Sequence, residues 1–428
     1  MNRTARIALV AHHANPELTS EPLIGWRWAK HLAPLVDLTL ITHVRNRAAI
    51  EERTLDARVL YVDTERTARR VQRLNDWLFP DPGSLNRLLF ETIAQAAFHR
   101  GATRLLRRLV RDDGVDVVHR VSPISPRYPT VMGRLGVPLV IGPVNGGMSL
   151  PAGFRLRRGV GSEAGLRLRG LARLLRWGSR SFDAVDRILV ANERTRETLP
   201  IRHRDRARVL CENAVEDDLL GTPPERTEGP LRLLFLGRLV AYKGLRYLLQ
   251  ALARLDHERV VLDVVGDGRQ RQDLEREARA LGLGSRVLWH GAVPQHEVRT
   301  WLRKSHVLVL PSVRESGGAV VLEGMAAGLP VVVADHGGPV ETVTPEAGIR
   351  VACGSPDELV EGLAHAISHL ERNEDRRRRL GHNARARVEH EYTWTGMAAR
   401  AVSLYRELAR PKWTCGGGWT AQTGGLPS

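Results

Sequence analysis

Two glutamates in the second half of the chain lie on either side of a glycine turn. Glu315 precedes this turn, which has the sequence Ser316-Gly317-Gly318. Glu323 falls inside the helix that the apolar spacing predicts from Ala319 to Ala327. A helix start favours an anion because its first N–H groups have no partner within the helix. Ionised carboxylates accept strong hydrogen bonds from hydroxyl groups, so the set fits a sugar joined to a nucleotide diphosphate. Surface glutamates on an ordinary helix are the alternative.

Two cations are expected at the same edge of the same sheet. Arg238 and Lys243 lie in the loop after the strand predicted from Leu231 to Leu236. The carboxyl ends of parallel strands meet at one edge, so this loop and the Glu315 turn should be neighbours. Cations there would neutralise a diphosphate and stabilise it further as charge builds on the leaving oxygen. A pair of surface cations in a loop is the alternative.

Further strand ends supply glycines and a segment that a base could reach. Gly237 and Gly266 each follow a predicted strand, and Val293 lies in the loop after another strand at Val287–Trp289. A base could stack on that loop or form hydrogen bonds with its backbone. The residues expected to bind a nucleotide-sugar donor are Gly237, Gly266, Val293, Ser316, Gly317, Gly318, Ala319 and Glu323.

Strands and helices alternate along both halves of the chain. This pattern is typical of parallel sheets with helices on both faces, and 428 residues are too many for one compact core. The sequence therefore predicts two doubly wound, Rossmann-like α/β domains. We expect a first domain at 1–210, a linker at 211–230 and a second domain at 231–392. Residues 393–410 should form a helix that returns to the first domain, and 411–428 a disordered tail.

The first half offers fewer residues with obvious chemistry. His119 ends the strand predicted at Val115–His119, where a lone histidine is more often structural than catalytic. The loop after the first strand reaches Ser20 and Glu21, and a later strand enters a glycine turn at Asn145. Such loops lie at the ligand-binding edge of parallel α/β sheets. Ser20, Glu21 and Asn145 are therefore the candidates for the acceptor side.

The formal net charge of +16 comes largely from arginine and permits contact with nucleic acid, an anionic membrane or an acidic substrate. Eight arginines fall between Arg155 and Arg180, around a loose leucine stripe. That segment could lie on a membrane surface, although a solvated helix packed by its leucines explains it as well. No apolar run is long enough to span a bilayer and no leader is recognisable, so we expect a cytoplasmic protein, with the inner membrane face as the alternative.

No cofactor motif is present. G-x-G-x-x-G and G-x-x-x-x-G-K-[ST] are both missing, and so is a D-x-D pair that would hold a divalent ion on a diphosphate. Cys211, Cys353 and Cys415 are scattered without metal-binding spacing, which favours free thiols in a reducing compartment. We therefore expect a reaction without metal or other cofactor, in which the nucleotide sugar is a substrate.

Four motifs follow one another in the second half. They are G-R-L-V-A-Y-K-G at Gly237–Gly244, V-G-D-G at Val265–Gly268, E-S-G-G-A-V-V-L-E at Glu315–Glu323 and G-L-P-V-V-V-A at Gly328–Ala334. Together they resemble the donor domain of the retaining family 4 glycosyltransferases, which have the GT-B fold. The resemblance is nearly continuous from Leu231 to Tyr392. The first half resembles the acceptor domain more loosely, through S-E-P-L-I-G-W, V-D-V-V-H and G-P-V-N-G-G.

The resemblance implies transfer of a sugar from a nucleotide diphosphate, with uridine as the base, and with retention of configuration. The acceptor would be a hydroxyl group of a cell-surface polysaccharide, a glycolipid or a small secondary metabolite. The diphosphate would lie on Arg238 and Lys243, and the ribose on Glu323. Glu315 would bind the sugar, and His119 would lie near it. His119, Arg238, Lys243 and Glu315 are thus the expected catalytic residues.

The chain departs from the family's pattern in two places, and other functions stay open. Gly317-Gly318 stands where the family often has Phe-Gly, and the loop from His12 to Pro22 lacks the usual glycine pair. A nucleotide-sugar epimerase of the same fold, which needs no acceptor, is the nearest rival. A basic protein that binds nucleic acid or membrane is the other. The sequence shows no nucleic-acid module, so we expect no nucleic-acid partner.

Overall fold

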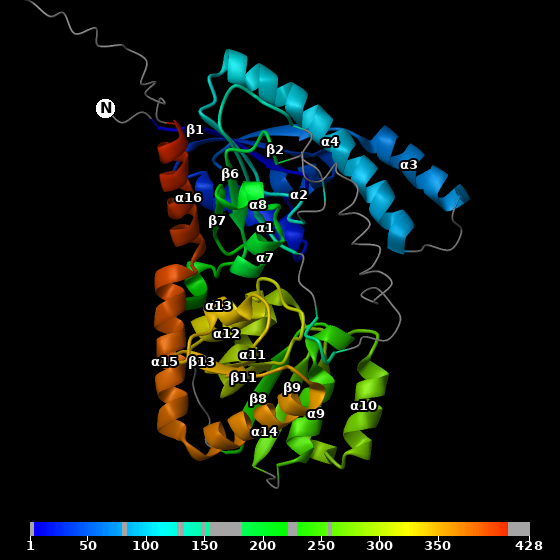
Figure 1. Ribbon diagram of the computed structural model, residues 1–428, viewed down its shortest axis with the longest axis vertical. Coiled ribbons are helices and arrows are strands. Elements are labelled where there is room, and N and C mark those ends of the chain that lie inside the picture. The colour runs from blue at the N-terminus through cyan, green and yellow to red at the C-terminus, as the bar shows by residue number, and fades with distance from the viewer. Residues whose placement is uncertain are drawn as a thin grey trace, which may run out of the picture.

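The computed structural model describes residues 4–78, 84–125, 128, 132–146, 150–154, 182–220, 229–255 and 259–409. The basic stretch Arg155–Arg180, residues 221–228 of the predicted linker and the tail 411–428 lie outside the described residues. Two parallel sheets carry the described part of the chain, one in the upper and one in the lower half of Figure 1.

The first sheet has seven parallel strands in the order β3-β2-β1-β4-β5-β6-β7. Its central strands are apolar and buried on both faces, as expected for a parallel sheet that helices cover. Helices α1 and α16 pack on one face, and α4 packs on the other. The strands are β1 (Arg6–Ala11), β2 (Asp37–His43), β3 (Arg58–Val62), β4 (Val117–Arg120), β5 (Leu139–Val144), β6 (Arg187–Val190) and β7 (Ala207–Val209). The helices in this half are α1 (Glu21–Leu32), η1 (Val44–Asn46), α2 (Arg47–Glu51), α3 (Glu65–Leu78), α4 (Ser84–Asp112), α7 (Glu193–Thr198), α8 (Ile201–Arg204) and η2 (Asp217–Leu220).

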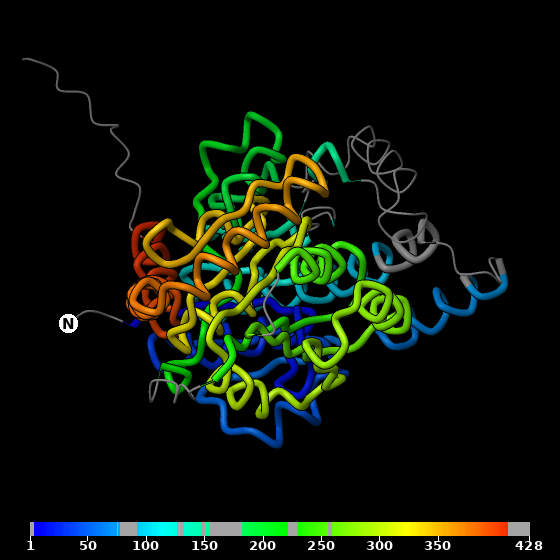
Figure 2. Tube along the Cα trace, turned by 90° about the horizontal axis from the view of Figure 1, so that it is seen from below, coloured from blue at the N-terminus to red at the C-terminus, as the bar shows by residue number. Residues whose placement is uncertain are grey.

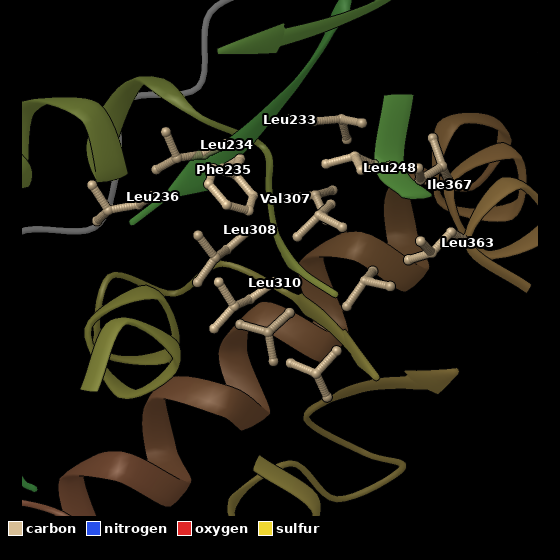
Figure 3. Close-up of a cluster of buried hydrophobic side chains, with 14 of the residues drawn as sticks. Leu233, Leu234, Phe235, Leu236, Leu248, Val307, Leu308, Leu310, Leu363 and Ile367 are labelled. Carbon is tan, nitrogen blue, oxygen red and sulfur yellow. The ribbon is translucent and has the colours of Figure 1, made fainter. Parts of the chain in front are cut away.

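The second sheet has six parallel strands in the order β10-β9-β8-β11-β12-β13. Figure 3 shows its core, where Leu233 and Val307 from neighbouring strands lie near Leu248 of α9 and Leu363 of α14. The strands are β8 (Leu231–Leu236), β9 (Val260–Val265), β10 (Val287–Gly291), β11 (Val307–Leu310), β12 (Val331–Ala334) and β13 (Gly348–Val351). The helices are η3 (Ala241–Lys243), α9 (Leu245–Ala253), α10 (Arg271–Ala280), η4 (Gly284–Arg286), η5 (Gln295–Glu297), α11 (Val298–Lys304), α12 (Ala319–Ala326), α13 (Pro339–Thr342), α14 (Pro356–Arg372), α15 (Glu374–Glu391) and α16 (Trp394–Ala409).

The last two helices join the halves along one side of the molecule. α15 lies beside the second sheet and α16 beside the first, and Figures 1 and 2 both show them at the same side. Trp394, Met397 and Tyr405 of α16 are fully buried in the core that α1 forms with the first sheet. Helix α16 therefore completes the core of the first half of the chain, although it comes last in the sequence.

A short segment of the first half packs on the second. Phe154 is 5% exposed and belongs to the core of the second sheet, where its ring meets Tyr247 edge to face at 5.4 Å. The sequence assigned all of 1–210 to the first domain. In the structure, Phe154 packs against α9 of the second half. No sequence pattern near Phe154 predicts this contact.

The predicted connection between the domains is anchored near its start, at Val215 and Glu216. Val215 forms a parallel bridge with Thr393, so the outgoing and returning chains lie side by side. The carboxylate of Glu216 contacts Lys30 at 2.8 Å and His31 at 3.1 Å, both on α1. Burial alone would raise the pKa of Glu216, but the hydrogen bonds from His31 and Lys30 lower it to about 2. The connection is thus fixed to α1 by a permanently charged carboxylate.

Candidate functional site

The candidate site lies at the point in the second sheet where the strand order reverses, between β8 and β11. Strand β8 has β9 on one side and β11 on the other, so the loops after β8 and β11 diverge from neighbouring strand ends. Ligands of open α/β sheets bind at such a switch point, at the carboxyl ends of the strands. The loop after β8 carries Arg238 and Lys243, and the loop after β11 carries Glu315.

Close backbone packing holds these two loops together. Gly244 begins α9 in the left-handed conformation (φ 77°), and a Cβ on it would lie 2.0 Å from the carbonyl oxygen of Pro311. The N–H of Val313 donates to the carbonyl of Tyr242 at 2.9 Å. Glycine at 244 therefore allows the loop after β8 to lie directly against the end of β11. This contact brings the predicted cations to the predicted carboxylate.

Lys243 and Glu315 form an ion pair. The Lys243 ammonium group donates to Glu315 Oε2 at 2.5 Å, and each side chain is only 14% exposed. The guanidinium group of Arg238, which is exposed, donates to the Tyr242 hydroxyl at 2.7 Å. The structure thus brings Arg238, Lys243 and Glu315 to one edge. Lys243 therefore has Glu315 as an anionic partner.

A tight turn connects Glu315 to α12. Gly318 precedes the helix in the left-handed conformation (φ 55°), and the N–H of Gly338 donates to the carbonyl of Glu315 at 3.0 Å. A Cβ on Gly338 would lie 1.6 Å from the carbonyl oxygen of Ser316, so only glycine fits there. The first N–H groups of α12 point out of its start, as at any helix N-terminus. The turn and helix start lie where the sequence placed an anion cradle.

The remaining donor-side residues surround this edge. Gly237 and Gly266 pack backbone to backbone, since a Cβ on Gly266 would lie 2.0 Å from the carbonyl oxygen of Gly237. Val293 is partly buried against the core. Glu323 lies on α12, partly exposed, and its carboxylate accepts from the Gln295 amide at 3.4 Å. Burial raises the pKa of Glu323, although the charge of Arg27 from α1 opposes this.

His119 does not join these residues. It is fully buried on β4, with Nδ1 bonded to the Tyr405 hydroxyl at 2.5 Å and Nε2 bonded to the carbonyl of Gly142 at 2.8 Å. Burial lowers its pKa to about 4, so the ring is neutral at physiological pH. That His119 lies near a transferred sugar, as the resemblance implies, stays a prediction, and the hydrogen bonds of the ring in the structure are with Tyr405 and Gly142. Helix α16 covers the ring, and α16 comes from a distant part of the chain.

The acceptor-side candidates are separated from one another. Ser20 is exposed just before α1, and Glu21 is the first residue of that helix. Asn145 lies at the end of β5 and is 7% exposed, and its amide donates to the carboxyl group of Glu212. Asn145 is linked to the donor-side turn through Glu212, since Glu212 Oε1 would lie 2.2 Å from a Cβ on Gly317.

The two halves of the molecule meet at this turn. The amide of Asn192, which caps α7 in the first half, donates to the carbonyl of Ser316 at 3.1 Å. The N–H of Glu193 donates to the Glu341 carboxylate at 2.6 Å. Sequence reasoning missed these contacts. The N-cap pattern of Asn192 followed by Glu193 was readable, but its position opposite α13 depends on the packing of the two sheets.

Within the described residues, no group of three or more His, Cys, Asp or Glu side chains has the arrangement of a metal site. None of the described helices is both long enough and apolar enough to cross a membrane.

Comparison with known proteins finds similarity chiefly in the second half of the chain. Residues 222–387 match the family described as group 1 glycosyl transferases. The similarity to this family therefore covers most of the second half of the chain. This chain is 34% identical over 176 residues to an uncharacterised glycosyltransferase of Methanocaldococcus jannaschii, over 41% of this chain and 44% of that protein. It is 35% identical over 195 residues to a D-inositol 3-phosphate glycosyltransferase of Xylanimonas cellulosilytica, over 45% of each chain. The chain matches less than half the length of these relatives.

Solved structures show the fold of the whole chain. The Anabaena protein HepE, crystallised in complex with UDP, superposes with a TM-score of 0.64 over 94% of this chain and 100% of that one, at 14% sequence identity. At this identity the likeness establishes architecture alone. The fold is therefore GT-B, with two parallel-sheet α/β halves, as the resemblance implied.

Proposed function

We propose that the protein is a glycosyltransferase that moves a sugar from a nucleotide diphosphate, a UDP-sugar, to a hydroxyl acceptor. The observation that carries this proposal is the position of Lys243 and Glu315. They face each other at the switch point of the half that is similar to group 1 glycosyl transferases, with Arg238 in the same loop as Lys243. The HepE complex with UDP supports uridine as the base of the donor.

Each candidate residue at the carboxyl edge of the second sheet has a role in this proposal. Arg238 and Lys243 bind the diphosphate and stabilise it as it leaves, together with the N–H groups at the start of α12. Glu315 accepts hydrogen bonds from sugar hydroxyls, and Glu323 from the ribose. Because two basic side chains and a helix start meet the diphosphate charge, the reaction proceeds without a divalent cation.

The chemistry proposed is a single displacement with retention. The bond between the anomeric carbon and the diphosphate breaks, and the acceptor hydroxyl attacks the face that the leaving group vacates. The proton of the hydroxyl passes to the departing phosphate oxygen, so no carboxylate nucleophile is needed. Contacts between the halves, such as Asn192 with Ser316, keep water away from the reacting carbon.

Thermal unfolding in the presence of nucleotide sugars tests the donor site. A ligand at a hundred times its Kd stabilises the folded state by about 2.7 kcal/mol, which raises the Tm by several degrees. We expect such a shift with a UDP-sugar, and its loss in Lys243→Ala. Lys304→Ala removes an exposed lysine on α11 and serves as the control.

The outcomes separate the alternatives. A shift that survives unchanged in Lys243→Ala contradicts the diphosphate assignment. Conversion of the nucleotide sugar in the absence of any acceptor would instead support an epimerase. Activity that persists in excess chelator supports the proposal that no metal takes part, and loss of activity that added Mg²⁺ restores contradicts it.

A further inference from the structure

A third carboxyl group, which the motifs did not include, lies against the donor-side turn. Glu212 is in the connection that follows β7, and it is 2% exposed. A Cβ on Gly317 would lie 2.2 Å from Glu212 Oε1 and 2.3 Å from the Asn213 amide nitrogen. The absence of a side chain at 317 therefore makes room for this carboxyl group.

One oxygen of the Glu212 carboxyl group accepts hydrogen bonds, and the other has no partner among the described residues. Oε1 accepts from the Asn145 amide and, at 3.4 Å, from the Asn213 amide. Oε2 of Glu212 and Oδ1 of Asn145 are both buried, and neither has a hydrogen-bond partner among the described residues. Both are acceptors if Glu212 is ionised. A buried acceptor without a donor is unfavourable, because it has lost its hydrogen bonds to water.

One proton accounts for both atoms. A protonated Oε2 can donate to Asn145 Oδ1 while Oε1 accepts from the Asn145 amide, which is the paired arrangement of a carboxylic acid with a primary amide. The charges nearby favour this neutral form. Glu315 lies close enough to disfavour a second negative charge, and Lys243 is already paired with Glu315.

We propose that Glu212 is a positioning residue of the donor site, which carries a proton and through it joins Asn145 of the first domain to the Gly317 turn of the second. The inference rests on the proposed function, because the turn that Glu212 supports is the one assigned to the donor. Asn145, which the sequence placed on the acceptor side, then acts through this link.

The electrostatic surroundings agree with this role. Burial, with a smaller contribution from Glu315, raises the pKa of Glu212 to about 8. Burial also raises the pKa of the adjacent thiol of Cys211 to about 12, so the thiol does not titrate in the same range. The charged and titratable groups around this segment are Glu315 with its partner Lys243, Cys211, Glu341 and Arg400.

Three variants test the proton link. Glu212→Gln keeps a neutral group that accepts from the Asn145 amide and donates to its Oδ1, but has no proton to lose. Glu212→Ala removes the link, and Glu389→Gln changes an exposed glutamate on α15 as the control. For the wild type we expect kcat/KM to fall as pH rises through about 8, because Glu212 ionises.

The expected readouts differ among the variants. Glu212→Gln should lose this alkaline fall and stay within about threefold of the wild type near neutral pH. Glu212→Ala should lose at least about tenfold in kcat/KM, chiefly through a higher KM for the donor, since hydrogen bonds that position a site are each worth about 1–2 kcal/mol. Glu389→Gln should keep the wild-type profile. Equal losses in Glu212→Gln and Glu212→Ala would overturn the proposal, as would an alkaline fall that persists in Glu212→Gln.

A second readout does not depend on turnover. The pKa of Glu212 is 4.5 in an ordinary environment and about 8 in the folded protein, so the folded state keeps a proton that the unfolded chain loses. The Tm of the wild type should therefore fall relative to that of Glu212→Gln as pH rises from about 4.5 to about 8, and then level off. If no donor is found, the proposed function fails, while this Tm difference still supports the proton link or, by its absence, overturns it.

Discussion

The ion pair between Lys243 and Glu315 sets a condition on ligand binding. Both side chains are mostly buried, so their attraction is screened less than that of a surface pair. A diphosphate at Lys243 would compete with Glu315 for the three donors of the ammonium group, and a carboxylate that is released can accept hydrogen bonds from the sugar. Binding of the diphosphate and of the sugar are therefore coupled through one side-chain exchange.

Glu315→Gln separates the two halves of the donor. The affinity for UDP should stay equal or improve, because Lys243 loses its competing partner. The affinity for the UDP-sugar should fall about tenfold to a hundredfold, as expected when a hydrogen bond to a charged acceptor is lost. Isothermal titration with both ligands measures this, and Glu346→Gln, at an exposed glutamate, is the control. Weaker UDP binding in Glu315→Gln would show that the carboxylate does not compete for Lys243.

At the scale of residues, the sequence predicted the donor side better than the acceptor side. Arg238 and Lys243 follow β8 and Glu315 follows β11, which are neighbouring strands of the core, and parallel strands carry such residues to one edge without further information. Glu212 could not be recognised, because an acidic, proline-rich stretch is typical of an exposed linker. Its burial depends on Gly317, which lies far along the chain. His119 was correctly placed near a strand end, but its burial depends on Tyr405.

At the scale of elements, the sequence predicted the strands that are buried on both faces, but it did not predict the edge strands β7 and β13. The boundaries of β1, β8, β9, β11 and β12 match the apolar runs. β7 and β13 were missed, because they are short, lie at the edges of their sheets and include arginines on an exposed side. The missed strands do not carry the loops after β8 and β11, so missing them did not affect the expectation that Lys243 and Glu315 are neighbours.

The turn before α12 depends on a glycine in the next connection. Gly338→Ala would place a methyl group 1.6 Å from the Ser316 carbonyl oxygen and must displace the turn. We expect about 1–3 kcal/mol less stability and at least about tenfold weaker donor binding. Gly282→Ala is the matched control, because its φ of 71° gives a strain of about 1–2 kcal/mol without any atom within 4 Å. If donor affinity falls equally in both variants, the turn before α12 does not contribute to donor binding.

At the scale of the whole molecule, the chain passes between its two halves more than once. Phe154 reaches the second core, the connection at Glu216 is fixed to α1, and α16 returns to the first core. Two sheets in this order follow from the alternation of strands and helices. The crossings do not, because they depend on surfaces that exist only after each sheet has formed.

Tyr405→Phe tests whether His119 supports the fold or the reaction. Removing the hydroxyl leaves the buried Nδ1 of His119 without its partner, which should cost about 1–3 kcal/mol in the free energy of unfolding. The donor Kd and kcat should not change if the hydrogen bond between His119 and Tyr405 is purely structural. Urea unfolding and steady-state kinetics measure the two effects. Ser403→Ala, on the exposed side of the same helix, should change neither. A lower kcat without a lower free energy of unfolding would show that His119 contributes to the reaction.

The late position of α16 in the sequence has a consequence for synthesis on the ribosome. All seven strands of the first sheet are translated before Trp394, Met397 and Tyr405, yet these side chains fill the space beside α1. Until they emerge, the nascent first half keeps an open apolar face and depends on protection from aggregation. The core of the second sheet is completed by Leu380, Ala384 and Val388 of α15, which directly precede α16, so the half that is made first is the half that is completed last.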